Sequence, residues 1–339
     1  MQSISVLFAK GISVTREVLI VGSGVIGMTA AAELLTRGVP VRIYTSKEKP
    51  VAGLNGVGIL ERQGDSINLV QQGRLTKTNS IAWEDRTFKK CEGFIREGSQ
   101  WVSFMPVEYH RMTRTGDPFE VPYNGMEARE LTDEEIIPPY QCGVLFNGFI
   151  INTRGCYAYL QNLVHSHQLF QGVEYGEIES PEEVNHPCAL IACGMGQRAW
   201  DSQIVPGLGE TLLMRDSSIP RSKVIGGIRK EYSANLVPIP GKRDEFILGA
   251  SKRDGLDETS PRQSWWDQIL NAGCEICPQL EHSDVLERRV GVRPKRIGGI
   301  LVEADEADGQ RRVIAGGFGG SGWTLSWGFA EWAAEFLMS

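Results

Sequence analysis

Near its start the chain carries the sequence Val18-Leu19-Ile20-Val21-Gly22-Ser23-Gly24-Val25-Ile26-Gly27. The first four residues are apolar and predict a buried strand, and the glycines that follow predict a tight turn into a helix. That helix is expected to run to Arg37 and to end at Gly38, which can adopt the left-handed conformation of a helix cap. Residues 39–44 then predict a second strand. Together these elements form a βαβ unit, the start of an α/β fold.

The GxGxxG spacing within this unit is typical of a dinucleotide-binding turn, in which each glycine has its own role. Gly22 permits the turn, Gly24 lets a pyrophosphate approach the backbone, and Gly27 lets the helix pack against the strand. Free N–H groups at the start of the helix, around Val25 and Ile26, can bind phosphate oxygens. We therefore predict that these five residues bind a dinucleotide cofactor.

The segment after the second strand lacks one feature of such a site, the acidic residue that holds the hydroxyls of the adenosine ribose. Residues 44–47 are Tyr-Thr-Ser-Lys, and the first carboxylate is that of Glu48. Ser46 could make a neutral hydrogen bond to the ribose, or Glu48 could reach back to it. Lys47 could instead bind a 2′-phosphate, which keeps NADP open as the cofactor. We place Ser46 and Lys47 in the cofactor site.

Composition and charge favour a folded chain that binds a small molecule. A length of 339 residues predicts about two domains, and 41% hydrophobic with 23% charged residues is typical of a globular protein. With 35 basic and 42 acidic residues the net charge is −7, and no basic cluster suggests nucleic acid or an anionic membrane as a partner. The first fifteen residues show neither an apolar stretch long enough to span a membrane nor an export signal.

The seven cysteines are odd in number and scattered along the chain, which predicts reduced thiols and a cytoplasmic location. Cys274 and Cys277 have the CxxC spacing, but no second pair of cysteines or histidines completes a zinc site near them. We therefore predict that the protein binds no metal ion.

Later segments predict further strands and a second glycine-rich turn. Residues 189–191 are a short apolar run before Gly194, which is typical of a buried parallel strand. Residues 236–240 and 245–249 predict two antiparallel strands joined by a short loop. The glycine cluster at 316–322 lies between a predicted strand and a predicted C-terminal helix. The backbone of that cluster is expected to approach a ligand closely.

In their order and spacing these motifs resemble the D-amino acid oxidase family of FAD-dependent oxidoreductases, nearly from end to end. The resemblance rests on residues 22–27, on 192–194 followed by Pro206-Gly207-Leu208-Gly209, on 290–296 and on 319–328. It implies an α/β fold in which an FAD-binding Rossmann-like βαβ domain is joined to a substrate domain with a mainly antiparallel sheet. The implied FAD-binding domain comprises residues 15–60, 145–215 and 285–339, and the implied substrate-binding domain comprises residues 61–144 and 216–284.

The resemblance also implies roles for individual residues. The arginine of the family's Gly-x-Arg-Pro segment binds the substrate carboxylate, and here that arginine is Arg293. A guanidinium group suits this role, because its planar fork can donate two parallel hydrogen bonds to one carboxylate. The second glycine cluster implies backbone contacts with the flavin. The remaining cofactor-binding residues implied are Gly194, Gly319, Gly320, Ser321, Gly322, Trp323 and Thr324.

Two segments depart from the family's pattern where the substrate is expected. Residues 315–318 read Ala-Gly-Gly-Phe where the family usually has His-Asn-Tyr-Gly, and the segment is one residue shorter. Asn235 stands where a strand of the family presents a tyrosine to the substrate, and Tyr232 could reach the same space. We therefore take Arg293, Tyr232 and Asn235 as the candidate catalytic residues, meaning those that contact the substrate.

The implied function is that of an FAD-dependent oxidase that dehydrogenates the Cα–N bond of a D-amino acid. Hydride passes to flavin N5 and leaves an imino acid, O2 is reduced to H2O2, and water hydrolyses the imine to a 2-oxo acid and ammonia. Arg293 orients the substrate, and no side-chain base is required. Relatives such as the monomeric sarcosine oxidases attach FAD through a cysteine near the C-terminus. Because no cysteine follows Cys277 in this chain, we predict that FAD is bound noncovalently.

Two alternatives remain open. Asn235 and the altered 315–318 segment favour a pathway-specific amine or imino-acid oxidase of the same fold that acts on a modified substrate. Lys47 and the absent ribose carboxylate favour an NADP-linked dehydrogenase or a nucleotide-binding regulator. The predicted partners are a small amino acid or amine and O2. We expect the protein to bind neither nucleic acid nor a membrane. Whether it forms a homodimer stays open.

Overall fold

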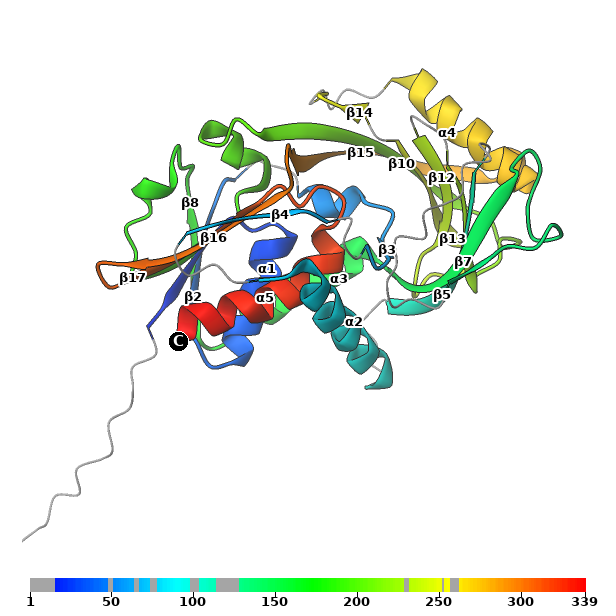
Figure 1. The fold of residues 1–339 in the computed structure, drawn as a ribbon. Coiled ribbons are helices and arrows are strands. Elements are labelled where there is room, and N and C mark those ends of the chain that lie inside the picture. Colours follow the sequence, from blue (N-terminus) through cyan, green and yellow to red (C-terminus); the bar gives the residue numbers. More distant parts are fainter. Residues whose placement is uncertain are drawn as a thin grey trace, which may run out of the picture.

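Figure 1 shows the computed structural model of the chain, which describes residues 16–47, 51–63, 67–73, 78–97, 104–113, 128–228, 232–251, 253–256 and 262–339. The side chains of residues 104–107, 228, 232, 233, 250 and 251 lie outside this description. The described residues form two β-sheets with helices packed against them. The predicted α/β fold, with a βαβ unit and a mainly antiparallel second sheet, is confirmed.

The seven-stranded sheet contains the predicted βαβ unit. β1 (Val18–Val21) and β2 (Val41–Thr45) are parallel neighbours, and α1 (Val25–Thr36) connects them. Among the described strands of this sheet, every neighbouring pair is parallel except β16 with β17. β1 and β2 are flanked on one side by β9 (Cys188–Ile191), β17 (Gln310–Gly316), β16 (Ile300–Ala307) and β4 (Leu69–Gln72), and on the other by β8 (Phe170–Tyr175).

Four of the described helices share one hydrophobic core with this sheet. α1 and α5 (Gly322–Met338) pack side by side and are apolar on most sides, because other elements cover both of them. α2 (Ser80–Arg96) packs against α5, and α3 (Thr153–Ser166) packs against α1. Within the part of the chain that the structure describes, no helix is long and apolar enough to cross a membrane.

The ten-stranded sheet is mainly antiparallel. Its longest strands, β10 (Ile204–Arg215) and β15 (Asp284–Arg296), pair along their whole length and extend toward the seven-stranded sheet (Figure 1). β12 (Tyr232–Pro238) and β13 (Glu245–Ser251) form the predicted antiparallel pair. α4 (Gln263–Ile276) packs on one face of the ten-stranded sheet. The other strands are β3 (Ile59–Leu60), β5 (Phe104–Thr113), β6 (Ala128–Glu130), β7 (Cys142–Ile151), β11 (Lys223–Ile228) and β14 (Arg253–Asp254).

Membership of the two sheets does not follow the predicted segment boundaries. β4 and α2 fall within residues 61–144 but belong with the seven-stranded sheet, whereas β7, β10 and β15 overlap the predicted FAD-binding segments but belong to the ten-stranded sheet. The reason is that strand pairing is decided by tertiary packing and not by position in the chain. β15 also contacts β16 and β17 of the seven-stranded sheet. The N–H of Gly319 donates to the carbonyl of Pro294 (2.8 Å) at the point where the two parts meet. The boundaries of the domains as folding units stay a prediction.

Candidate cofactor and substrate site

The turn between β1 and α1 has the backbone geometry that its glycines predict. Gly22 has a φ of 106°, and a side chain there would overlap the carbonyl of Ala192. A side chain at Gly27 would overlap the carbonyl of Gly22, so this glycine allows α1 to pack against the turn. Apart from its two chain neighbours, no described residue comes within 4 Å of the position that a Cβ of Gly24 would occupy. The space in front of Gly24 is therefore open to a ligand.

Two helix N-termini adjoin this space. α1 begins after Gly24 and α5 begins after Ser321, and residues from both first turns line one cavity. Among the described residues, no side chain caps either helix and no acidic residue lies in either first turn. The partial positive charge of each N-terminus is therefore left for an anionic ligand.

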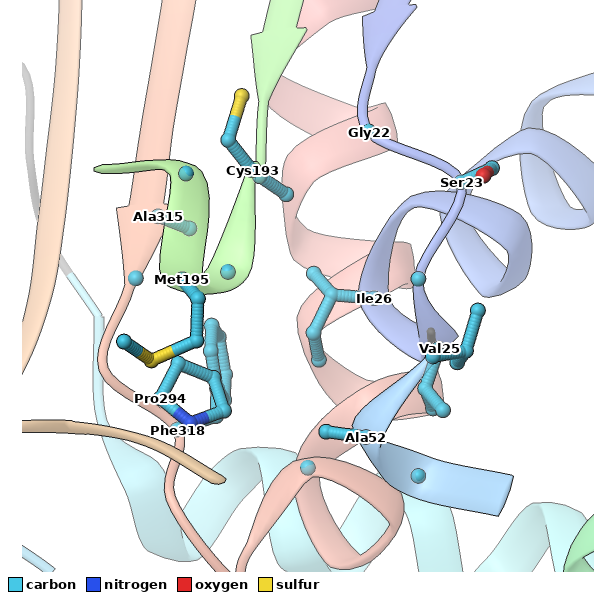
Figure 2. A pocket seen from close by; sticks show the side chains of 18 of the residues that line it. Gly22, Ser23, Val25, Ile26, Ala52, Cys193, Met195, Pro294, Ala315 and Phe318 are labelled. Carbon is cyan, nitrogen blue, oxygen red and sulfur yellow. The ribbon is translucent and has the colours of Figure 1, made fainter. Parts of the chain in front are cut away.

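The cavity has a volume of about 650 Å³, which is within the range of small-molecule sites. The β1–α1 turn forms one side of it, and Met195, Pro294 and Phe318 lie on the other (Figure 2). Its lining extends from the ends of β2 and β8 to Arg293 on β15. The predicted site residues that line it are Gly22, Gly24, Val25, Ile26, Ser46, Gly194, Arg293, Gly319, Gly320, Gly322 and Trp323.

Three predicted cofactor residues support this cavity without lining it. Gly27 lies beneath the turn, in contact with the backbone of Gly22. Thr324 is buried within α5. The Ser321 hydroxyl donates to the side-chain carbonyl of Gln63 (2.8 Å). Their positions explain why these residue types fit the local structure, and a direct cofactor contact for them stays a prediction.

Of four further predicted residues, two do not line the cavity and two lie outside the described part of the chain. Lys47 is exposed, and its ammonium group lies 5.4 Å from the centre of the Tyr175 ring. Asn235 is buried in β12 and is not among the residues that line the cavity. Glu48 and the side chain of Tyr232 lie outside the described part of the chain.

Several lining residues were missed by sequence analysis. One group of them lies in or beside the 3-10 helix η1 (Ala52–Asn55), at the edge of the cavity near the start of α5. Its lining residues are Val51, Ala52, Gly53 and Gly56. The indole N–H of Trp323 donates to the carbonyl of Gly53 (3.1 Å). The Gly-x-x-Gly spacing of residues 53–56 was the available signal. The lining residues 176–179 carried no comparable signal.

Arg293 lies at one end of the cavity. Its guanidinium lies over Gly209 of β10, where any side chain would overlap it, and its Nη1 donates to the carbonyl of Leu208 (3.3 Å). Burial lowers the pKa of Arg293, and the negative charges of Glu210 and Asp254 oppose that shift. Because an arginine stays protonated despite such a shift, Arg293 presents a fixed positive charge.

Further charged groups surround Arg293. The carboxylate of Glu210 is fully buried, 3.6 Å from Nε of Arg253. Burial raises the pKa of Glu210, whereas the charges of Arg253 and Arg293 lower it. Lys295 forms an ion pair with Asp254. These five side chains comprise three cations and two anions, so this end of the cavity suits a ligand with a negative charge.

A model of the family described as FAD dependent oxidoreductase matches residues 17–336. The chain belongs to this family. The resemblance to D-amino acid oxidases is confirmed, and the cofactor is FAD. The family decides for FAD over the NADP-linked alternative.

Two D-amino-acid oxidases are similar to this FAD-dependent oxidoreductase over nearly its whole length. The match with a D-amino-acid oxidase of Rubrobacter xylanophilus is 26% identical over 328 residues and covers 95% of each chain. A D-amino-acid oxidase of Streptomyces coelicolor is 25% identical over 94% of this chain and 96% of its own. A D-aspartate oxidase of Talaromyces thermophilus is 26% identical over 76% of this chain and 73% of its own.

Solved structures share the fold of this oxidoreductase. Glycine oxidase from Geobacillus kaustophilus superposes with a TM-score of 0.79 over 95% of both chains, at 16% sequence identity. Iminodiacetate oxidase from Chelativorans sp. BNC1 superposes with a TM-score of 0.70 over 95% of both chains, at 17% identity. At these identities the likeness establishes the fold alone.

The described residues fit FAD. The turn at 22–26 offers an open backbone and the N-terminus of α1 to a pyrophosphate. Gly320 and Gly322 resemble Gly24, since no described residue outside their own chain segment comes within 4 Å of their Cβ positions. The backbone N–H groups before α5 are therefore accessible to the other part of the cofactor. We propose that residues 22–26 hold the phosphates and that residues 319–323 hold the flavin end.

Asn235 lies on the same face of the ten-stranded sheet as the Arg293 guanidinium. Asn235 pairs with Gly249 of β13, and Gly249 pairs with Thr211 of β10. Gly209 is two residues from Thr211, and residues two apart in a strand point to the same face. The guanidinium of Arg293 lies over Gly209. Register across three strands therefore brings Asn235 and Arg293 to one face.

Tyr109 of β5 fixes the side chain of Asn235. The Tyr109 hydroxyl donates to Oδ1 of Asn235 (2.5 Å), and both residues are buried. A side chain at Gly226, which lies between them on β11, would overlap both. With its carbonyl oxygen engaged by Tyr109, the Asn235 amide has its NH2 group as a donor. Sequence analysis missed Tyr109, because it is 126 residues from Asn235 in the chain.

Proposed function

We propose that this FAD-dependent oxidoreductase is an oxidase of D-amino acids that acts on the Cα–N bond. Overall, the amino acid loses two electrons and two protons and becomes an imino acid, and O2 gains them and becomes H2O2. Water then converts the imino acid to a 2-oxo acid and ammonia. When bound, FAD supplies the acceptor for the two electrons. The observation that carries the proposal is the Arg293 guanidinium over Gly209 at the end of the FAD cavity.

Arg293 is suited to hold one carboxylate of the substrate. Its guanidinium can donate two parallel hydrogen bonds, which fix both the position and the rotation of the carboxylate. Orientation of this kind can contribute roughly 7–11 kcal/mol to catalysis. Among the described lining residues there is no histidine, aspartate or lysine, and the glutamates at 177 and 179 lie beside β8. We infer that the chain binds and orients the substrate and that no side-chain base acts on it.

The relatives support an amino acid as the substrate. Those of known name include oxidases of D-amino acids and of D-aspartate. The solved structures of the same fold include glycine oxidase and iminodiacetate oxidase. All of these named substrates carry a carboxylate one carbon from a nitrogen, which is the arrangement that Arg293 would orient.

A second candidate is an amine or imino-acid oxidase of the same fold with a modified substrate. It is favoured by Asn235, which has an amide where the family has a phenol. It is also favoured by residues 315–318, which line the cavity without a polar side chain. Both features change the groups available to a substrate.

An assay for H2O2 separates these two candidates. The FAD-loaded protein is tested with D-amino acids, with their L enantiomers, and with glycine, sarcosine and D-proline. The first candidate predicts H2O2 from at least one chiral D-amino acid and none from its enantiomer. If FAD-loaded protein gives no H2O2 with any D-amino acid, the first candidate is wrong and the second is favoured.

We also propose that FAD is held noncovalently. The prediction rests on the absence of a cysteine after Cys277 in the sequence. Acid precipitation should therefore release the flavin into the supernatant and leave a colourless pellet. Flavin absorbance that stays with the precipitated protein would show a covalent bond.

A further inference from the structure

The ends of β1, β2 and β8 meet at one edge of the seven-stranded sheet, since these strands are parallel neighbours. In a βαβ dinucleotide site the adenosine ribose lies at the end of the second strand. Here that strand ends with the neutral residues Thr45 and Ser46. The hydroxyls of Ser23 and Thr45 are 2.9 Å apart and bond to each other. In the described structure, the end of β2 therefore offers no carboxylate to the ribose.

The loop after β8 is held directly against the end of β2. The N–H of Gly176 donates to the carbonyl of Thr45 (3.0 Å). The hydroxyl of Tyr44 donates to the carbonyl of Glu177 (3.4 Å). A side chain at Gly176 would overlap the Tyr44 hydroxyl, so glycine is required for this approach. The loop is therefore a fixed part of the cavity at the end of β2.

The charge that this loop brings to the cavity is negative. Residues 176–179 line the cavity, and two of them are Glu177 and Glu179. Lys47, which a 2′-phosphate would need, is not a lining residue and lies against the ring of Tyr175. Carboxylates accept hydrogen bonds from hydroxyl groups and repel a phosphate. This end of the cavity thus suits a ribose with free hydroxyls.

We propose that the loop after β8 replaces the carboxylate missing from the end of β2, with Glu177 and Glu179 accepting hydrogen bonds from the ribose hydroxyls of the FAD adenosine. The inference rests on membership of the FAD-dependent family and is independent of which substrate is oxidised. It makes an edge strand, distant in sequence from the glycine turn, part of the cofactor site. It also makes a 2′-phosphorylated adenosine a poor ligand.

The first test measures binding of FAD and of FMN to protein stripped of its cofactor, through the change in flavin fluorescence. Glu177→Gln and Glu179→Gln should each weaken FAD binding several-fold, and the double variant about tenfold or more, because hydrogen bonds to charged acceptors are lost. FMN lacks the adenosine, so its dissociation constant should not change. Glu174→Gln is the matched control: Glu174 lies on β8 and pairs with Arg42 (2.8 Å), outside the cavity lining. It should leave FAD binding unchanged.

The second test uses the wild-type protein alone, so it holds even if the variants fail to fold. ADP and its 2′-phosphorylated form compete with FAD for the stripped protein. The proposal predicts that the 2′-phosphorylated form competes at least about tenfold less well, since a phosphate meets two carboxylates. Equal competition by the two nucleotides would overturn the proposal. So would a folded double variant whose affinity for FAD is within about twofold of wild type.

Discussion

The two ends of the cavity are built in different ways. Toward the phosphates and flavin, the cavity is formed by main-chain groups of two short segments, residues 22–26 and 319–323. Toward the proposed substrate, the groups are side chains on separate strands: Arg293 of β15 lines the cavity, and Asn235 of β12, held by Tyr109 of β5, lies on the same face of the ten-stranded sheet without lining the cavity. A backbone site needs only small residues in a fixed local conformation. A side-chain site needs the right residues in register across the sheet.

This difference explains what the relatives can and cannot establish. Backbone contacts persist at low identity, so the match to the FAD-dependent family over residues 17–336 is enough to indicate the cofactor. Side-chain contacts change with single substitutions, such as the amide at Asn235. The substrate must therefore be determined by experiments that act on one end of the cavity at a time.

The largest effect is expected at the substrate end, from Arg293→Leu. Breaking a desolvated charge pair costs about 2–5 kcal/mol, so kcat/KM should fall at least roughly a hundredfold. FAD should stay bound, because residues 22–26 are untouched. Arg288→Leu is the control, since Arg288 is exposed and lies five residues away, on the opposite face of β15. If the steady-state kinetics of both variants match those of the wild type, Arg293 does not hold the substrate.

A smaller effect is expected at the cofactor end, from Gly24→Ala. Because no described residue apart from its two chain neighbours comes within 4 Å of its Cβ position, the methyl group should fit the protein but occupy space needed by the pyrophosphate. Loss of one charge-assisted hydrogen bond would weaken FAD binding by about tenfold or more. Thermal unfolding of the cofactor-free protein should change little.

Gly93→Ala is the control for this prediction. Gly93 lies within α2 and also has open space at its Cβ position. The substitution should stabilise the protein by roughly 0.5–1 kcal/mol, because alanine loses less conformational entropy in a helix, and should leave FAD binding unchanged. A Gly24→Ala protein that binds FAD as tightly as the Gly93→Ala protein would contradict the assignment of the turn.

The smallest effect is expected from Tyr109→Phe, which removes the hydroxyl that orients Asn235. KM should rise by about fivefold while kcat changes little, since an unsatisfied buried amide costs about 1–3 kcal/mol, part of it in stability. Tyr140→Phe is a matched control: Tyr140 is buried against Gly227, the neighbour of Gly226 on β11, and thus on the opposite face. Equal KM values in the two variants would mean that Tyr109 has only a structural role.

The cofactor end could be predicted from sequence because its residues are close together in the chain. Gly22, Gly24 and Gly27 lie within one strand–turn–helix unit: Gly22 has the expected positive φ, Gly27 has the expected close contact, and Gly24 faces the open space that a pyrophosphate would need. Arg293 was identified through the family's motif and could not be distinguished from other arginines by local pattern.

The rest depends on which strands become neighbours. Tyr44 contacts Glu177 across 133 residues, and Tyr109 contacts Asn235 across 126 residues. Neither contact has a local signal, since strand pairing is decided by tertiary packing. The same reason explains why β4 joins the seven-stranded sheet and α2 packs in its core, although residues 61–144 were expected in the substrate-binding domain.

The central claim is that an amino acid held by Arg293 reduces FAD bound between the two glycine-rich turns. The most direct test is the visible spectrum of the FAD-loaded protein, recorded without O2 before and after a D-amino acid is added. The account predicts a yellow protein that a D-amino acid bleaches and that its L enantiomer leaves yellow, and the Arg293→Leu variant should bleach at least roughly a hundredfold more slowly at the same low concentration of the D-amino acid. A protein that takes up no FAD, or one whose yellow colour no amino acid removes, would contradict it.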